Sequence, residues 1–373
     1  TIQYGFEGSI GNNSLNFTRI ENGNPAADAF VMTPADVYRA GVFASDKVEL
    51  GNEKKYVLTP SLRVDYYNVN PLNTAEYFAL TNAKAASFVN LSVSPGLSAL
   101  YKITPDINVY GLYAMGTRNP TSGELNGVFS HAGGGVAGAQ LRIVPNRDLK
   151  EEVANNFELG IQGNTERHAF RLAGFYNIYD NFIETEYQTG LIDSDGYEIY
   201  TSRNLDNVNI YGIEASWHWN VDKKLLGGLD GFQLGASAAW TKGRQDTDFG
   251  KQALDSVDPF RLVVYLGYVA PDDTWGVRLS GTFVAKKSSS EISYTVNAGV
   301  RSYAYAPVDS AFVLDLTGFY RFNENWTLNA GLNNLTDKEY YTWSSARVSG
   351  GGMSSKRYAQ PGINGFVSLT AKF

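Results

Sequence analysis

Residues 312–333 read FVLDLTGFYRFNENWTLNAGLN, and they contain two alternating segments separated by a short polar turn. In the first segment, large apolar residues alternate with Asp315, Thr317 and Arg321; the second alternates from Trp326 to Asn333. Successive side chains of a β-strand point to opposite faces of the sheet. The stretch therefore predicts a β-hairpin with one apolar and one polar face.

About fourteen segments of this kind follow one another along the chain, at residues 2–10, 37–50, 55–68, 89–103, 107–117, 152–164, 167–184, 199–220, 231–242, 258–270, 274–287, 309–322, 326–342 and 362–373. The connections between them alternate in length. Short turns lie at 51–53, 104–106, 163–165, 270–273 and 323–325. Long loops lie near 11–36, 68–88, 118–151, 185–198, 243–257, 288–308 and 343–361.

This rhythm of connections separates two kinds of β fold. A soluble β-sandwich also alternates apolar and polar residues, but it has no reason to place every long loop at one end. Outer-membrane barrels have short periplasmic turns and long extracellular loops. We therefore predict an all-β fold, a transmembrane antiparallel β-barrel. Its apolar face would contact outer-membrane lipid, and its tryptophans beside short turns would form an aromatic belt; these are Trp217, Trp219, Trp275 and Trp326.

Composition excludes several function classes. The 373 residues contain no cysteine, so disulfide and thiol chemistry are absent, and no run of eighteen apolar residues predicts a membrane-spanning helix. The formal net charge of -7 argues against nucleic acid as a partner. Catalytic motifs are absent, and Asp193, Asp195 and Gly196 form only a fragment of a calcium loop. We do not expect an enzyme.

The loop at 118–151 is the candidate functional segment. Proline-centred turns, Asn119-Pro120 and Pro145-Asn146, stand at its two ends, and it holds a single histidine, His131, just after Phe129. A loop of this length without regular structure is usually functional or disordered. Imidazole is a good axial ligand for haem iron, and the following glycines would allow a flat ligand to approach closely.

The two ends of this loop resemble sequence motifs of a known family. The residues Arg118-Asn119-Pro120, Glu124-Leu125, Pro145-Asn146 and Leu149 to Glu152 resemble the paired motifs that flank the haem-binding loop of TonB-dependent haem and haemoglobin receptors, commonly written Phe-Arg-Ala-Pro and Asn-Pro-Asn-Leu. Thr117 and Asn119 depart from the first motif, and two residues separate Asn146 from Leu149 in the second. Segments 39–67, 207–215, 258–287, 333–341, 357–358 and 361–362 also resemble the receptor barrel of the haemoglobin and transferrin receptor branch.

The resemblance implies a receptor in the outer membrane of a Gram-negative bacterium. Such a receptor captures haem, here from haemoglobin or another haem carrier protein, and imports it by TonB-driven active transport. It implies His131 as the ligand of the haem iron and Phe129 as a haem contact. Flanking motif residues would be Arg118, Pro120, Glu124, Pro145, Asn146, Leu149 and Glu152. A second axial ligand would come from a plug domain or from Tyr294, Tyr303 or Tyr305. His168 and His218 stand beside short turns, so we interpret both as structural.

Fourteen strands allow two architectures. They could form a complete small barrel, or the final part of a 22-stranded barrel whose lumen holds a plug. The abrupt start of the chain and the lack of a plug in it favour the second. We therefore expect residues 1–373 to be the C-terminal part of a receptor barrel. The complete receptor would contact the TonB complex through the plug that is missing here. The alternatives are a transferrin-type iron receptor or a siderophore receptor of the same class, and a fourteen-stranded passive channel or fatty-acid porin.

Overall fold

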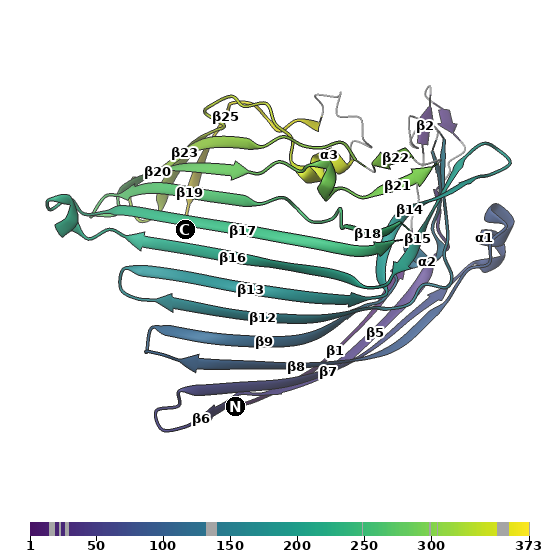
Figure 1. The fold of residues 1–373 in the computed structure, drawn as a ribbon, viewed down its shortest axis with the longest axis horizontal. Helices are drawn as coiled ribbons and strands as arrows, with labels where there is room; N and C mark the ends of the chain where they lie inside the picture. The colour runs from purple at the N-terminus through teal and green to yellow at the C-terminus, as the bar shows by residue number, and fades with distance from the viewer. Residues whose placement is uncertain are drawn as a thin grey trace.

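The computed structural model describes residues 1–14, 19–21, 24–26, 30–131, 140–247, 249–297, 300–303, 305–348 and 358–372 of the chain. Its main feature is a strongly curved antiparallel sheet that forms the wall of the molecule (Figure 1). Among the described residues, no helix is both long and apolar enough to cross a membrane.

Fourteen strands pair consecutively in this wall. In order they are β1 (Ile2–Asn13), β5 (Ala35–Asp46), β7 (Tyr56–Pro71), β8 (Phe88–Lys102), β9 (Ile107–Arg118), β12 (Glu152–Asn164), β13 (His168–Asp180), β16 (Val208–Asn220), β17 (Phe232–Thr247), β19 (Arg261–Val269), β20 (Trp275–Val284), β23 (Ala311–Arg321), β24 (Trp326–Asn333) and β25 (Asn364–Ala371). Two short strands, β6 (Val48–Leu50) and β18 (Gly250–Ala253), pair with the ends of β7 and β17. Over the part of the chain described, β1 and β25 do not pair, so the sheet is an open barrel wall.

The predicted all-β antiparallel architecture is confirmed, with the expected number of wall strands. Several segment boundaries were wrong. The predicted strand 326–342 ends at Asn333, and the segment 37–50 is divided between β5 and β6. The predicted strand 199–220 is two strands, β15 (Glu198–Leu205) and β16, and the segment 167–184 breaks between β13 and β14 (Phe182–Ile192). Asn207 and Asn181 stand at the last two breaks with positive φ angles of 56° and 53°. Asparagine tolerates this left-handed conformation, so the chain turns where the alternation continues without interruption.

Smaller elements gather at the long-loop end of the wall (Figure 1). A five-stranded sheet runs β14-β15-β11-β10-β4, with β11 (Leu141–Val144), β10 (Val128–His131) and β4 (Phe30–Val31). Two hairpins, β2 (Arg19–Glu21) with β3 (Asn24–Ala26) and β21 (Tyr294–Asn297) with β22 (Val300–Tyr303), accompany it. The helices of this end are α1 (Thr74–Thr81), α2 (Ser122–Asn126), α3 (Trp343–Val348) and the 3₁₀ turn η3 (Ser289–Glu291); η2 (Lys223–Leu226) lies in a connection at the opposite end.

The wall has no conventional core. Its apolar side chains point outward and stay exposed, among them Leu159 (66%), Ile213 (51%) and Phe157 (44%). The buried clusters instead lie near the long-loop end, where one joins the ends of β5 and β7 and the other three involve loop residues. Such an exposed apolar surface is expected of a wall that contacts lipid.

Close contact between wall strands generates a first prediction. A Cβ atom on Gly212 in β16 would stand 2.4 Å from the backbone oxygen of Trp240 and 2.8 Å from the Phe175 ring, whereas one on Gly174 would meet nothing nearer than 3.9 Å. We expect Gly212→Ala to lower the free energy of unfolding by about 1–3 kcal/mol and the control Gly174→Ala to change it by less than about 0.5 kcal/mol. Urea midpoints of the lipid-reconstituted protein would measure this, and equal midpoints would contradict it.

Candidate functional site

A single guanidinium group fastens the base of loop 118–151. Arg118 ends β9 directly opposite Glu152, the first residue of β12. Its Nη1 lies 2.9 Å from Oε1 of Glu124, and its Nε lies 3.4 Å from Oε2 of Glu152. Both carboxylate side chains are only 12% exposed. Glu152 also accepts a hydrogen bond from the Ile183 backbone N–H at 3.0 Å, so the network joins the loop to β14.

Helix α2 continues this anchor. Its capping box is complete: Oγ1 of Thr121 accepts from the Glu124 N–H at 3.2 Å, and the Glu124 carboxylate accepts from the Thr121 N–H at 2.8 Å. Such reciprocal bonds satisfy two donors that the first helical turn leaves free. Pro120 is fully buried, and the Tyr67 hydroxyl donates to its carbonyl at 3.3 Å.

The second motif holds the returning strand. Asn146 donates from Nδ2 to the Ser202 carbonyl at 2.9 Å and accepts from the Asp148 N–H at 2.9 Å. Pro145 follows β11 directly. Leu149 is buried in one cluster with Ala86, Leu125 and Ile183. The structure thus brings all seven predicted motif residues to the loop base, and the contacts of six of them, all except Pro145, anchor the loop.

Strand β10 carries the predicted ligand-contact residues above this base. Phe129 is in register with Ile143 of β11 and with Phe30 of β4, and His131 is in register with Leu141. The His131 side chain and residues 132–139 lie outside the described part of the structure. The role of His131 as an iron ligand therefore stays a prediction.

The other two histidines lie at the short-turn end, as predicted. His168 begins β13 and stacks on the Trp219 ring, with centroids 5.7 Å apart. His218 in β16 lies with Nδ1 2.5 Å from the Tyr265 hydroxyl and Nε2 3.1 Å from Oδ1 of Asn220. Both imidazoles are engaged in the wall, in agreement with structural roles.

The fragment of a calcium loop has a structural explanation. Oδ1 of Asp193 accepts hydrogen bonds from the Tyr197 and Asp195 N–H groups at 3.0 and 2.9 Å. The Arg142 guanidinium lies 2.5 Å from Asp193 and 3.3 Å from Asp195. The backbone bond from Tyr197, with Arg142 nearby, holds the pKa of Asp193 below its usual value. Within the described ranges, no group of three or more acidic, histidine or cysteine side chains could hold a metal ion.

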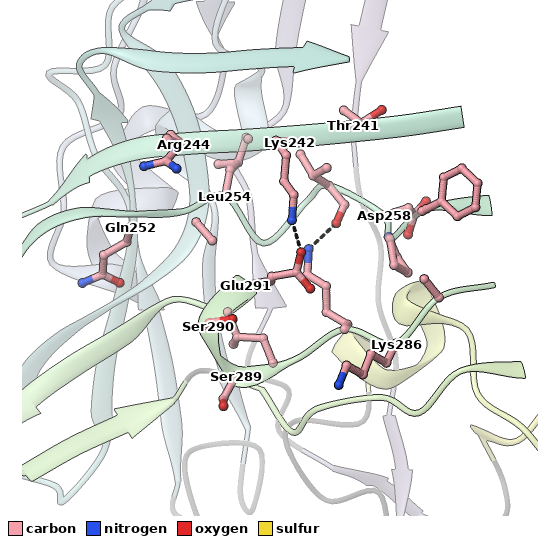
Figure 2. Close-up of a pocket in the computed structure, with 18 of the residues that line it drawn as sticks. Thr241, Lys242, Arg244, Gln252, Leu254, Asp258, Lys286, Ser289, Ser290 and Glu291 are labelled. Atoms are coloured by element: carbon pink, nitrogen blue, oxygen red, sulfur yellow. Dashed lines mark hydrogen bonds and ion pairs between the residues drawn. The ribbon is translucent and has the colours of Figure 1, made fainter. Parts of the chain in front are cut away.

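Sequence reasoning missed a basic cavity of about 820 Å³ beside the end of β17 (Figure 2). Six cationic side chains line it, namely Lys242, Arg244, Lys251, Lys286, Lys287 and Arg301, against the two acids Asp258 and Glu291. Figure 2 shows Lys242 and Glu291 pointing toward each other, and they form an ion pair. Burial acts to raise the pKa of Glu291, but the hydrogen bonds from Lys242 and the Ser288 backbone, together with the charges of Lys242 and Lys287, outweigh it and lower that pKa overall.

A buried cluster holds three loops together under this cavity. The Lys287 ammonium donates to the Val257 carbonyl at 2.6 Å and lies 5.1 Å from the Trp343 ring centroid. Asp255 accepts from the Ser293 N–H at 2.9 Å through its carboxylate and from Trp343 Nε1 at 2.6 Å through its carbonyl. Burial lowers the pKa of Lys287 and raises that of Asp255.

The three tyrosines proposed as second axial ligands pack within these loops. Tyr305 meets the Trp343 ring edge-on at 5.7 Å. Tyr294 and Tyr303 pack against each other across the β21–β22 hairpin, with ring centroids 5.9 Å apart. Their present role is packing, and their ligand role stays untested.

Comparison with known proteins places this geometry in a family. The family profile described as "TonB dependent receptor-like, beta-barrel" matches residues 1–335. The chain belongs to this family of receptor barrels.

Named relatives support the same placement. The chain is 26% identical over 375 residues to the hemoglobin-haptoglobin utilization protein B of Neisseria meningitidis serogroup A, covering 92% of this chain and 45% of that protein. It is 32% identical over 275 residues to transferrin-binding protein A of Neisseria meningitidis serogroup B, covering 66% of this chain and 29% of that protein. The solved structure of copper transporter OprC superposes with a TM-score of 0.70 at 19% identity, covering 91% of this chain and 48% of that one. The receptor barrel described here thus spans less than half the length of these relatives.

The anchor of the receptor's loop can be tested at Arg118. Removing its side chain would leave two poorly exposed carboxylates without their cationic partner, so we expect Arg118→Ala to destabilise the loop base by about 1–3 kcal/mol. Hydrogen exchange at the Glu124, Leu125 and Ile183 amides should become faster. Arg321→Ala is the control, because Arg321 pairs with a 61% exposed Asp273 and such pairs contribute at most about 1 kcal/mol. Equal exchange in Arg118→Ala and the wild type would refute the anchor.

The buried cluster of the receptor should respond to pH. Burial raises the pKa of Asp255 above its ordinary value of 3.8. Its stabilising contribution is therefore complete below pH 3.8 and is lost as pH rises through the folded-state pKa. Opening of the cluster, measured from hydrogen exchange at the Ser293 amide and corrected for intrinsic exchange, should become easier across that window. Asp255→Asn should lack this dependence; the same dependence in both proteins would exclude Asp255 as its source.

Proposed function

We propose that the chain is part of an outer-membrane receptor of a Gram-negative bacterium that captures haem and imports it by TonB-driven active transport. The haem would come from haemoglobin or another haem carrier protein. The observation that carries this proposal is the anchored loop 118–151. Arg118, Glu124 and Glu152 fasten its base, so that β10 holds the loop's single histidine, His131, at the long-loop end. His168 and His218 lie at the opposite end of the wall.

The chemistry of capture follows from these positions. A neutral imidazole suits haem iron as an axial ligand, and Phe129 would add apolar contact area in the same strand. The polar face of the wall would line the route of passage, and a plug would transmit the pull of the TonB complex. Families of this kind consist of receptors and transporters, and we assign the chain no catalytic role or catalytic cofactor; haem is its cargo.

A transferrin-type iron receptor is the second candidate. It is supported by the 32% identity to transferrin-binding protein A over two thirds of this chain. A siderophore receptor would share the fold but explains the loop histidine less well. The likeness to a copper transporter concerns the fold alone. Growth with haem or with iron-loaded transferrin as the sole iron source separates the first two functions.

His131 provides the direct test. On the complete receptor, we expect His131→Ala to weaken haem binding roughly tenfold or more, because an axial bond to iron is lost, and to shift the Soret band in a spectral titration. His168→Ala is the matched control and should leave both unchanged. An unaltered spectrum and affinity in His131→Ala would remove this residue from the site, and absence of haem binding by the wild type would reject the proposed cargo.

A further inference from the structure

One face of the β21–β22 hairpin borders the basic cavity at the long-loop end of the molecule. Strand register pairs Tyr294 with Tyr303 and Val296 with Arg301, so these four side chains share one face of the hairpin. Three of them, Tyr294, Arg301 and Tyr303, line the cavity. The hairpin therefore offers the cavity two phenol rings and a guanidinium group.

Tyr294 is held in place through both its backbone and its ring. Gln252 of β18 donates from Nε2 to the Tyr294 carbonyl at 2.9 Å and accepts from the Tyr294 N–H at 2.8 Å. The Arg301 guanidinium lies 4.5 Å from the centre of the Tyr294 ring. The Tyr294 hydroxyl has no hydrogen-bond partner among the residues that the structure describes. The ring is thus fixed, while its oxygen remains available to a ligand.

Two guanidinium groups border this end of the cavity without an acidic partner. Arg244 and Arg301 are exposed, and within the described ranges neither forms an ion pair. Figure 2 shows Arg244 and Gln252 at one end of the cavity, away from the Lys242–Glu291 ion pair. A guanidinium group suits a carboxylate, because it can donate two parallel hydrogen bonds to it. Two such groups suit a ligand that carries two carboxylates.

We propose that this end of the cavity binds ferric haem, at a site separate from His131. Haem has a flat apolar ring and two carboxylates, and a cavity of about 820 Å³ lies within the range of natural ligand pockets, about 300–1,000 Å³. The Tyr294 oxygen binds the iron, and Arg244 and Arg301 bind the two carboxylates. This inference rests on haem as the cargo in the proposed function, and it adds a second station with ligands of its own.

Iron ligation by the phenol needs no further reactant. The Tyr294 O–H gives its proton to water, and its oxygen forms a bond to the ferric iron in place of the water bound there. No electron is transferred, so the iron stays ferric. Tyrosine is one of the axial ligands that hold haem iron in proteins. The Arg301 guanidinium beside the ring offsets part of the negative charge of the phenolate.

The test uses the complete receptor carrying His131→Ala, so that the loop histidine contributes no signal. This background is titrated with ferric haem and with metal-free protoporphyrin IX, which has the same ring and carboxylates but no iron. Adding Tyr294→Phe should abolish the resonance Raman bands of an iron–phenolate bond and weaken haem binding roughly tenfold or more. Binding of protoporphyrin IX should stay unchanged, a difference that a misfolded hairpin would not produce. Tyr187→Phe is the matched control, because Tyr187 is another loop tyrosine with a guanidinium, that of Arg203, beside its ring.

The carboxylate contacts are tested in the same background. Arg244→Ala/Arg301→Ala should weaken haem and protoporphyrin IX alike, by roughly tenfold or more, because the carboxylates of both lose their donors. Lys223→Ala/Lys224→Ala removes two charges at the short-turn end and should bind both porphyrins as the background does. Unchanged binding of both porphyrins by Arg244→Ala/Arg301→Ala would overturn the site.

The outcomes separate the second station from the proposed function. A His131→Ala receptor that binds no haem, although the wild type does, would overturn the second station and leave the proposed function standing. Iron–phenolate bands or a haem affinity that persist in Tyr294→Phe would overturn it in the same way. Equal weakening of haem and protoporphyrin IX in Tyr294→Phe would reduce this tyrosine to a packing contact. A wild type that binds no haem would instead reject the cargo of the proposed function, and the second station with it.

Discussion

The requirement that every backbone N–H and C=O within hydrocarbon be paired by the protein itself governs this structure. Water cannot satisfy these groups at membrane depth, so a spanning sheet needs an uninterrupted ladder on each strand. Between its two edge strands, β1 and β25, which do not pair in the part of the chain described, the wall meets this requirement by joining neighbouring strands in antiparallel pairs. The backbone ladder therefore holds the sheet together without help from side chains. Their outward face can stay apolar and exposed, as Leu159 and Ile213 do.

The long loops lack the continuous ladder of the wall, and only some of their segments pair, as in the sheet β14-β15-β11-β10-β4. Side chains hold the loop bases. Arg118 joins two carboxylates at one loop base, and Lys287 joins the Val257 carbonyl and the Trp343 ring at another. Buried polar side chains that have few other partners available fix the path of such segments. A receptor loop built in this way can present a ligand residue without relying on the sheet.

Alternation made the wall predictable, since a two-residue period with an apolar face indicates a strand regardless of what surrounds it. The breaks at Asn181 and Asn207 were not predictable from it, because the pattern runs through both and only the backbone φ records the turn. The motif residues at 118–152 were found from the family resemblance, which depends on their order along the chain. The cavity was not, since its lining residues come from segments far apart in the sequence, and paired lysines such as Lys286-Lys287 are usual on any solvated loop.

Strand geometry finally relates the two ends of the wall. On the outward face of β16, every second residue from Tyr211 to Trp219 faces the same side, and eight residues at about 3.3 Å each span roughly 26 Å along the strand. Outer-membrane barrels carry an apolar band of about 25 Å between aromatic girdles, and strand tilt shortens the span further. Tyr211 and Trp219 therefore mark the two borders of a membrane-sized band. Register with Tyr211 then puts Lys242 at the border and Arg244 just beyond it, toward the long loops.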